Sequence, residues 1–156
     1  MFRSPQVEAI VEELSVDGGK IRVRTPLGKP CEWKDYKAMS LHQLASAAKF
    51  QDNQSLIDWV NSQQLSELVT CLGDGHDGIW NIVEQIANRE QRFEILDWFH
   101  LTENLYKVDA LPKFLDKVKN YLWLGEVDYA IAELELLSIP PKNFIAYITK
   151  HRFRIP

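Results

Sequence analysis

The chain has 156 residues, of which 46% are hydrophobic and 26% charged, and its formal net charge is −4. This length and composition are typical of one globular domain with a buried core, and the charge argues against the whole chain being a strong nucleic-acid binder. No apolar run approaches the roughly 18 residues of a membrane span, the first residues lack the apolar centre of a secretory signal, and two cysteines are too few for a disulfide framework, so we expect an intracellular protein without a membrane segment.

The first part of the chain predicts an antiparallel sheet. Residues 11–17 and 20–25 have the composition of two strands, and the Gly18-Gly19 pair between them suits a tight hairpin turn. A second turn at residues 25–30 leads to a third strand at residues 31–39. Basic residues alternate with apolar ones along the second strand, which gives that strand one basic face. These basic residues are Lys20, Arg22 and Arg24.

After residue 40 the spacing of apolar residues changes from that of strands to that of helices. Leu41, Leu44 and Ala48 have helical spacing, and another short helix is predicted over residues 55–64. Strands and helices then alternate: a strand at 67–72, a helix after Asp77, a strand at 92–96 and a helix at 98–108. From Leu111 onward the pattern is helical throughout. The order predicts an α/β core followed by an all-helical extension.

Two aspartates directly follow apolar, strand-like runs, and each precedes a glycine. They occur in Val16-Asp17-Gly18-Gly19 and in Leu72-Gly73-Asp74-Gly75. In an α/β protein such positions allow a carboxylate to stand at the end of a strand, clear of the core. Carboxylate oxygens are the ligands that Mg²⁺ prefers, and two of them on neighbouring strands make half of a site for two-metal phosphoryl transfer.

Each of these aspartates also has a simpler interpretation. Asp17 is typical of a hairpin turn, in which Asp-Gly-Gly is common. Asp74 is able to cap the helix that follows, although Asp77 is better placed for this, which leaves Asp74 without an evident structural role. His76 is then a loop residue near the start of that helix.

The segment Asp97-Trp98-Phe99-His100 joins a predicted strand to a predicted helix. Asp97 is suited to capping that helix, and a lone histidine in such a place is more often structural than a metal ligand. No second histidine or cysteine lies at the spacing of a zinc site. Basic residues gather at 20–29 and again at 150–154, where they are able to contact phosphates, although solvated faces are the commoner explanation for such clusters.

Three motifs in this order resemble the core of prokaryotic insertion-sequence transposases of the DDE class, which has an RNase H-like fold. The motifs are Val16–Gly19, Leu72–Gly75 with Ile79-Trp80, and Ile95–His100, the last being similar to the (Cys/Asp)-x-x-His element of Mutator-like relatives. The likeness covers roughly residues 10–156. It implies an RNase H-like core at residues 1–108, with a mixed sheet of three antiparallel strands followed by helix–strand units. It also implies that residues 109–156 are a helical segment that starts an insertion domain.

The resemblance further implies roles for individual residues. Asp17, on the first strand, would be the first catalytic acid, and Asp74, at the end of the fourth strand, the second; both would be metal ligands. Asp97 and His100 would support the site or the DNA contact. The candidate DNA contacts are Lys20, Arg22 and Arg24. The complete enzyme of this family binds two Mg²⁺ ions, hydrolyses a DNA strand and joins the freed 3′-hydroxyl to target DNA, which implies a cytoplasmic, nucleoid-associated protein of a prokaryote.

Two features depart from the pattern of the family. Only about ten residues precede the first strand, where the family carries a DNA-binding region, and the chain stops at Pro156, before the third acid, a glutamate. We therefore expect a truncated transposase with two of the three acids, with weak or partial Mg²⁺ binding and little or no strand transfer by itself. We also expect it to associate with DNA, with itself or with a full-length transposase.

Two alternatives stay open. The first is a non-catalytic nucleic-acid-binding or assembly protein that reuses the RNase H-like fold. The second is an unrelated α/β protein in which the aspartates are only turn and cap residues.

Overall fold

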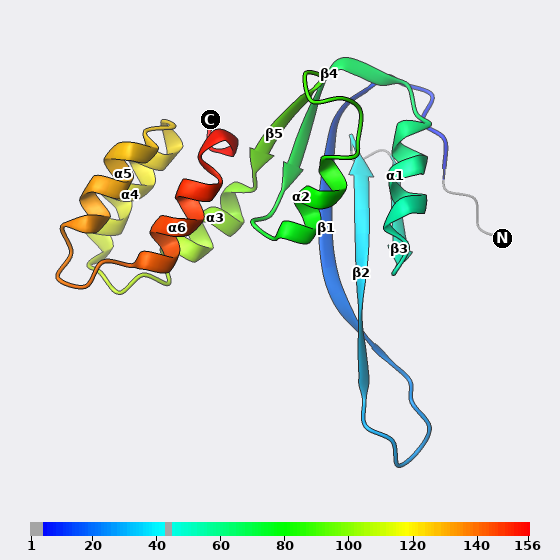
Figure 1. The fold of residues 1–156 in the computed structure, drawn as a ribbon, viewed down its shortest axis with the longest axis horizontal. Coiled ribbons are helices and arrows are strands. Elements are labelled where there is room, and N and C mark those ends of the chain that lie inside the picture. The colour runs from blue at the N-terminus through cyan, green and yellow to red at the C-terminus, as the bar shows by residue number, and fades with distance from the viewer. Residues whose placement is uncertain (1–4, 43–44) are drawn as a thin grey trace. The chain divides into compact units, whose positions relative to one another are not determined.

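The computed structural model describes residues 5–42 and 45–156, and the chain divides into two compact units, one ending at Phe93 and one beginning at Glu94 (Figure 1). The described residues contain five β-strands, six α-helices and one short 3-10 helix. The predicted α/β class is therefore confirmed.

The strands form one mixed sheet in the order β3-β2-β1-β4-β5. They are β1 (Val11–Val23), β2 (Glu32–Leu41), β3 (Ala45–Phe50), β4 (Leu65–Gly73) and β5 (Arg92–Leu96). β1 pairs antiparallel with β2, and β2 pairs antiparallel with β3, whereas β1 and β4 are parallel. The expected antiparallel opening is thus present, and the predicted strands at 67–72 and 92–96 correspond to β4 and β5.

The predicted hairpin turn at Gly18-Gly19 is wrong, because both glycines lie inside the continuous strand β1. Gly18 pairs with Lys37 of β2 and Gly19 pairs with Tyr36. A Cβ atom at Gly19 would lie 2.8 Å from Cε1 of Tyr36, so the side chains of β2 occupy the space that side chains on β1 would need. The glycines serve close packing between strands rather than a reversal of the chain.

The chain reverses instead between β1 and β2, within the second predicted turn. The main-chain N–H of Lys29 donates to the carbonyl oxygen of Pro26 at 3.1 Å, and Gly28 has a φ of +86°, in the region that favours glycine. The two predicted strands of the first hairpin are therefore one strand, and their partner is β2.

The predicted helix from Leu41 to Ala48 is also wrong. Leu41 ends β2, and Ala48 lies in β3, where it pairs with Ala38. Leu44, the middle member of the helical pattern, lies outside the described residues. Pairing with the neighbouring strand outweighs the helical preference of the alanines, because strand formation depends on tertiary context more than on local propensity.

The first two helices are α1 (Asn53–Asn61) and α2 (Asp77–Val83), and they cover one face of the sheet. Leu14 and Val16 of β1 are buried together with their cross-strand partners Leu41 and Met39. Because paired residues of an antiparallel sheet point to the same face, these four side chains form one apolar layer. The helices contribute the other side of this core through Leu56, Ile57, Val60, Ile79, Trp80, Ile82 and Val83.

The described residues after β5 form helices. These helices are α3 (Trp98–Leu105), α4 (Pro112–Trp123), α5 (Val127–Glu135) and α6 (Lys142–Lys150), followed by a 3-10 helix at Arg152–Arg154. Trp98 meets Trp123 edge to face, with ring centroids 4.8 Å apart. Among the described residues, no helix combines the length and the apolarity needed to cross a bilayer.

The first prediction concerns Gly73, the last residue of β4. A Cβ at this position would lie 2.7 Å from Cγ2 of Ile79, a buried side chain of α2, so we expect Gly73→Ala to lower the free energy of unfolding by about 1–3 kcal/mol through overpacking. Urea denaturation followed by far-UV circular dichroism measures this loss.

Gly18→Ala is the matched control. There the atoms in the way are the flexible end of Lys37, with Nζ at 2.6 Å from the Cβ position, so the side chain is able to move aside at little cost. Equal destabilisation by both substitutions would contradict the packing of α2 against Gly73.

Candidate functional site

The two candidate acids lie at neighbouring positions on adjacent parallel strands. Val16 of β1 pairs with Gly73, the last residue of β4. Asp17 follows Val16, and Asp74 follows Gly73, so each aspartate stands one residue beyond the last parallel pair. Because neighbouring strands lie about 5 Å apart, the parallel pairing brings the two carboxylates to the same edge of the sheet.

The two carboxylates differ in surroundings. Asp17 is exposed and Asp74 is half-buried. Oδ1 of Asp17 accepts a hydrogen bond from the main-chain N–H of Gly18 at 2.7 Å, and Oδ1 of Asp74 accepts one from the N–H of His76 at 2.8 Å. Each of these contacts uses one of the roughly four acceptor sites of the carboxylate.

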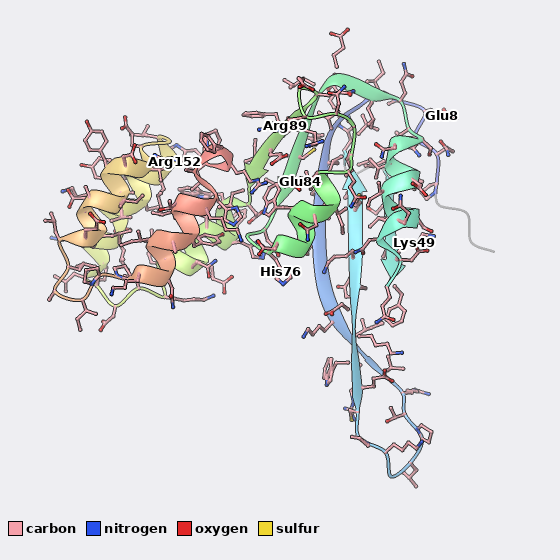
Figure 2. All side chains as sticks on the ribbon, in the orientation of Figure 1. Glu8, Lys49, His76, Glu84, Arg89 and Arg152 are labelled. Carbon is pink, nitrogen blue, oxygen red and sulfur yellow. The ribbon has the colours of Figure 1, made fainter. Side chains whose placement is uncertain are left out.

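The start of α2 differs from the prediction in its capping residue. His76, and not Asp77, is the N-cap: Nδ1 of His76 accepts a hydrogen bond from the N–H of Gly78 at 3.1 Å. Figure 2 shows His76 next to α2. An imidazole nitrogen that accepts is unprotonated, so the proton of the neutral ring lies on Nε2. Asp77 is the first residue of the helix, where its negative charge is favourable. Asp74 does have a structural role, because its bond to His76 holds the turn from β4 into α2.

The donor chemistry of the Asp17–Asp74 pair fits a magnesium ion. Mg²⁺ takes oxygen ligands in octahedral geometry, and in proteins it is held by one or two carboxylates while it keeps several waters. Two aspartates that start from adjacent strands meet this requirement for one ion. Within residues 5–42 and 45–156, no group of three or more His, Cys, Asp or Glu side chains is placed to hold a metal ion.

Lys37 lies close to this edge of the sheet, and the sequence interpretation did not single it out. A methyl group at Gly18 would come within 2.6 Å of Nζ of Lys37, and one at Gly78 within 3.7 Å of its Cε. Lys37 therefore extends across β1, next to Asp17, toward the first turn of α2. Because neighbours along a strand alternate between faces, Lys37 reaches this edge from the face that α2 covers and Asp17 from the opposite face.

Asp97 and His100 lie in the second unit and contact one another. Asp97 is the N-cap of α3: its Oδ1 accepts from the N–H of His100 at 2.9 Å and lies 3.0 Å from Nδ1 of the same residue. The predicted capping role of Asp97 is therefore confirmed. About half of the His100 side chain is exposed.

The candidate DNA contacts are farther along β1 than the aspartates. Lys20 and Arg22 are exposed in the second half of the strand, about 10 and 17 Å beyond Asp17 at the usual rise per residue. Arg24 follows the end of the strand and is exposed as well. A guanidinium N–H of Arg22 donates to the thiol sulfur of Cys31. The sheet therefore separates these cations from the carboxylates rather than gathering them into one cluster.

The sequence was also compared with known proteins. A scan against models of protein families gives no match, and a search of curated proteins finds no significant relative.

The second prediction tests the structural role of Asp74. Asp74→Ala removes the acceptor of the His76 N–H, so we expect it to lower the free energy of unfolding by about 0.5–1.5 kcal/mol. Asp74→Asn keeps an oxygen at the same position and is expected to lose less. Urea denaturation of both variants measures the two free energies of unfolding. Equal decreases in Asp74→Ala and Asp74→Asn would show that the stability of the turn does not depend on the hydrogen bond.

Proposed function

We propose that this chain is the core of an insertion-sequence transposase of the DDE class, with an RNase H-like fold in which Asp17 and Asp74 are the first two catalytic acids. The observation that carries the proposal is the parallel pairing of β1 with β4, which sets both aspartates at one edge of the sheet. The mixed five-stranded sheet is compatible with an RNase H-like core. The helices α4, α5 and α6 are the candidates for the start of an insertion domain in this proposal.

The proposed chemistry is phosphoryl transfer on DNA. Bound Mg²⁺ would activate the attacking oxygen and stabilise the leaving oxygen of the phosphodiester. The side chains of this protein would hold the cation. Asp17 and Asp74 would each supply a carboxylate oxygen from the end of a rigid strand. The hydrogen bond that the main-chain N–H of His76 donates orients the Asp74 carboxylate. Orientation of this kind by neighbouring hydrogen bonds strengthens metal binding.

We expect the chain by itself to transfer DNA strands slowly or not at all. Two carboxylates provide two ligands to one cation, whereas positioning two cations and a nucleophile requires further ligands. Asp97 and His100 are proposed to support the site or the DNA contact. Their mutual hydrogen bond restrains the imidazole ring, which suits either task.

A second candidate function is a non-catalytic protein that binds nucleic acid. It is favoured by the separation between the carboxylate pair and the exposed basic residues of β1, since DNA contact then does not depend on the acids. Metal binding distinguishes the two functions, because only the first requires it.

The third prediction is that Asp17 and Asp74 bind one divalent cation jointly. In a titration with Mn²⁺, monitored by electron paramagnetic resonance, Asp17→Asn and Asp74→Asn should each weaken binding about tenfold or more, because each removes a direct ligand. Asp58→Asn is the control, since Asp58 lies on α1 and contacts Gln54. Titration curves of Asp17→Asn and Asp74→Asn that match the wild type would contradict the joint site.

The fourth prediction concerns DNA cleavage. With supercoiled plasmid and Mg²⁺ or Mn²⁺, the chain should produce at most slow nicking and no joining, and Asp17→Asn or Asp74→Asn should remove whatever nicking there is. Efficient cleavage and joining that both substitutions abolish would support the catalytic pair and contradict the expected inactivity of the chain by itself. Nicking that neither substitution affects would contradict the role of the pair.

A further inference from the structure

The second half of β1 and the first half of β2 form a two-stranded ribbon without a third strand. β1 pairs with β4 only from Val11 to Val16, and β2 pairs with β3 only from Tyr36 to Leu41. In the part of the chain that the structure describes, the strand residues between these limits, 20–23 and 32–35, pair only with each other, and residues 24–31 join them. Figure 1 shows this ribbon running beyond the ends of the other strands. We call residues 20–35 the ribbon arm.

The ribbon arm carries a charge opposite to that of the rest of the chain. It contains five basic and two acidic residues, a net charge of +3, whereas the remaining residues include 13 basic and 20 acidic ones, a net charge of −7. The basic residues are Lys20, Arg22, Arg24, Lys29 and Lys34. A basic element on an acidic protein gives a local field that attracts polyanions, although the net charge of the chain is negative.

The two faces of the ribbon arm differ in how their cations are used. Lys34 lies on the face of Ile21, and its Nζ is 3.3 Å from Oε1 of Glu32 and 5.8 Å from the ring centroid of Phe50. This cation is therefore engaged within the protein. The opposite face carries Lys20 and Arg22 of β1. On β2, Asp35 is the cross-strand neighbour of Lys20, and Trp33 is that of Arg22.

Arg22 and Trp33 together form the most distinctive part of that face. Trp33 is 61% exposed, so its ring is accessible to a partner. Arg22 donates to the sulfur of Cys31, which is a weak acceptor, so a phosphate oxygen would be a stronger partner for the guanidinium. Arginine beside an exposed aromatic ring combines a donor to anions with an apolar surface that is able to contact the base edges and thymine methyl groups of a DNA groove.

We propose that the ribbon arm inserts into a groove of duplex DNA, with the face of Lys20, Arg22 and Trp33 against the DNA. The major groove of B-DNA admits a two-stranded β-ribbon, and the phosphates on both sides attract its cations. This inference rests on the proposed function, because it names the surface that holds the DNA on which Asp17 and Asp74 act. Lys20 lies three residues beyond Asp17 on the same strand, and the alternation of side chains places it on the face opposite to that of Asp17.

The fifth prediction tests this surface in the full chain by fluorescence anisotropy with a labelled duplex of about 20 bp between roughly 50 and 200 mM salt. Arg22→Ala should weaken binding about 3–10-fold and reduce the slope of log K against log salt by about 1, because one phosphate contact is lost. Trp33→Ala should weaken binding by a similar factor and leave the salt slope unchanged, because the ring carries no charge.

Lys34→Ala is the matched control, because Lys34 lies on the opposite face of the same ribbon, and it should bind within about twofold of the wild type. Lys20→Ala is a second charge variant that leaves the Arg22–Trp33 pair intact and should also reduce the salt slope by about 1. Circular dichroism of each variant verifies that it is folded.

Three outcomes would overturn the inference. The first is wild-type DNA affinity in both Arg22→Ala and Trp33→Ala. The second is a change in self-association, seen by sedimentation, with DNA affinity unchanged, which would assign the arm to contacts between copies of the chain. The third is stronger binding of single-stranded RNA of the same length, which would assign the arm to that ligand. The Mn²⁺ titration separates this inference from the proposed function. Mn²⁺ binding that Asp17→Asn leaves unchanged would overturn the metal site, and intact DNA binding in the same protein would leave the role of the arm in place.

Discussion

The parallel pairing of β1 with β4 is the constraint on which the candidate site depends. Its last pair, Val16 with Gly73, decides that the residues after it, Asp17 and Asp74, share one edge of the sheet. A shift of one residue in this register would turn one carboxylate toward the other face. The buried layer around Val16 resists such a shift, because the same slip would move core side chains into solvent.

Glycines next to the aspartates make this arrangement possible by leaving space rather than by bending the chain. Gly73 leaves space for Ile79, so α2 packs directly on the end of β4, and Gly18 and Gly19 leave space for Lys37 and Tyr36. The glycine after Asp17 and the glycine before Asp74 therefore each have a packing explanation. The start of α2 and Lys37 therefore lie on one face of this part of the sheet, and Asp17 lies on the other.

The fold could be predicted from the sequence where local periodicity determines it, and not where strand pairing does. The strand β4 and the helices α2 and α3 follow from apolar spacing, and the cap of α3 follows from Asp97, whereas the cap of α2 is His76 and not Asp77. The continuity of β1 and the strand β3 do not, because they depend on a partner strand distant in sequence. The same distinction applies to the candidate site. Asp17 and Asp74 could be identified from the apolar residues that precede them in the sequence, whereas the position of Lys37 depends on its pairing with Gly18 on another strand. The ribbon arm is likewise recognisable as a separate element only because β1 stops pairing with β4 at Val16.

The most direct measurement of the central proposal locates a bound metal along the chain. When Fe²⁺ replaces Mg²⁺ in the full chain and is made to generate hydroxyl radicals with ascorbate and peroxide, the backbone is cut next to the bound iron. The account predicts cuts adjacent to both Asp17 and Asp74, which Mg²⁺ suppresses in proportion to its occupancy and which Asp17→Asn removes at both places. Cuts near only one of the two aspartates, or a pattern that Mg²⁺ does not change, would contradict a shared metal site.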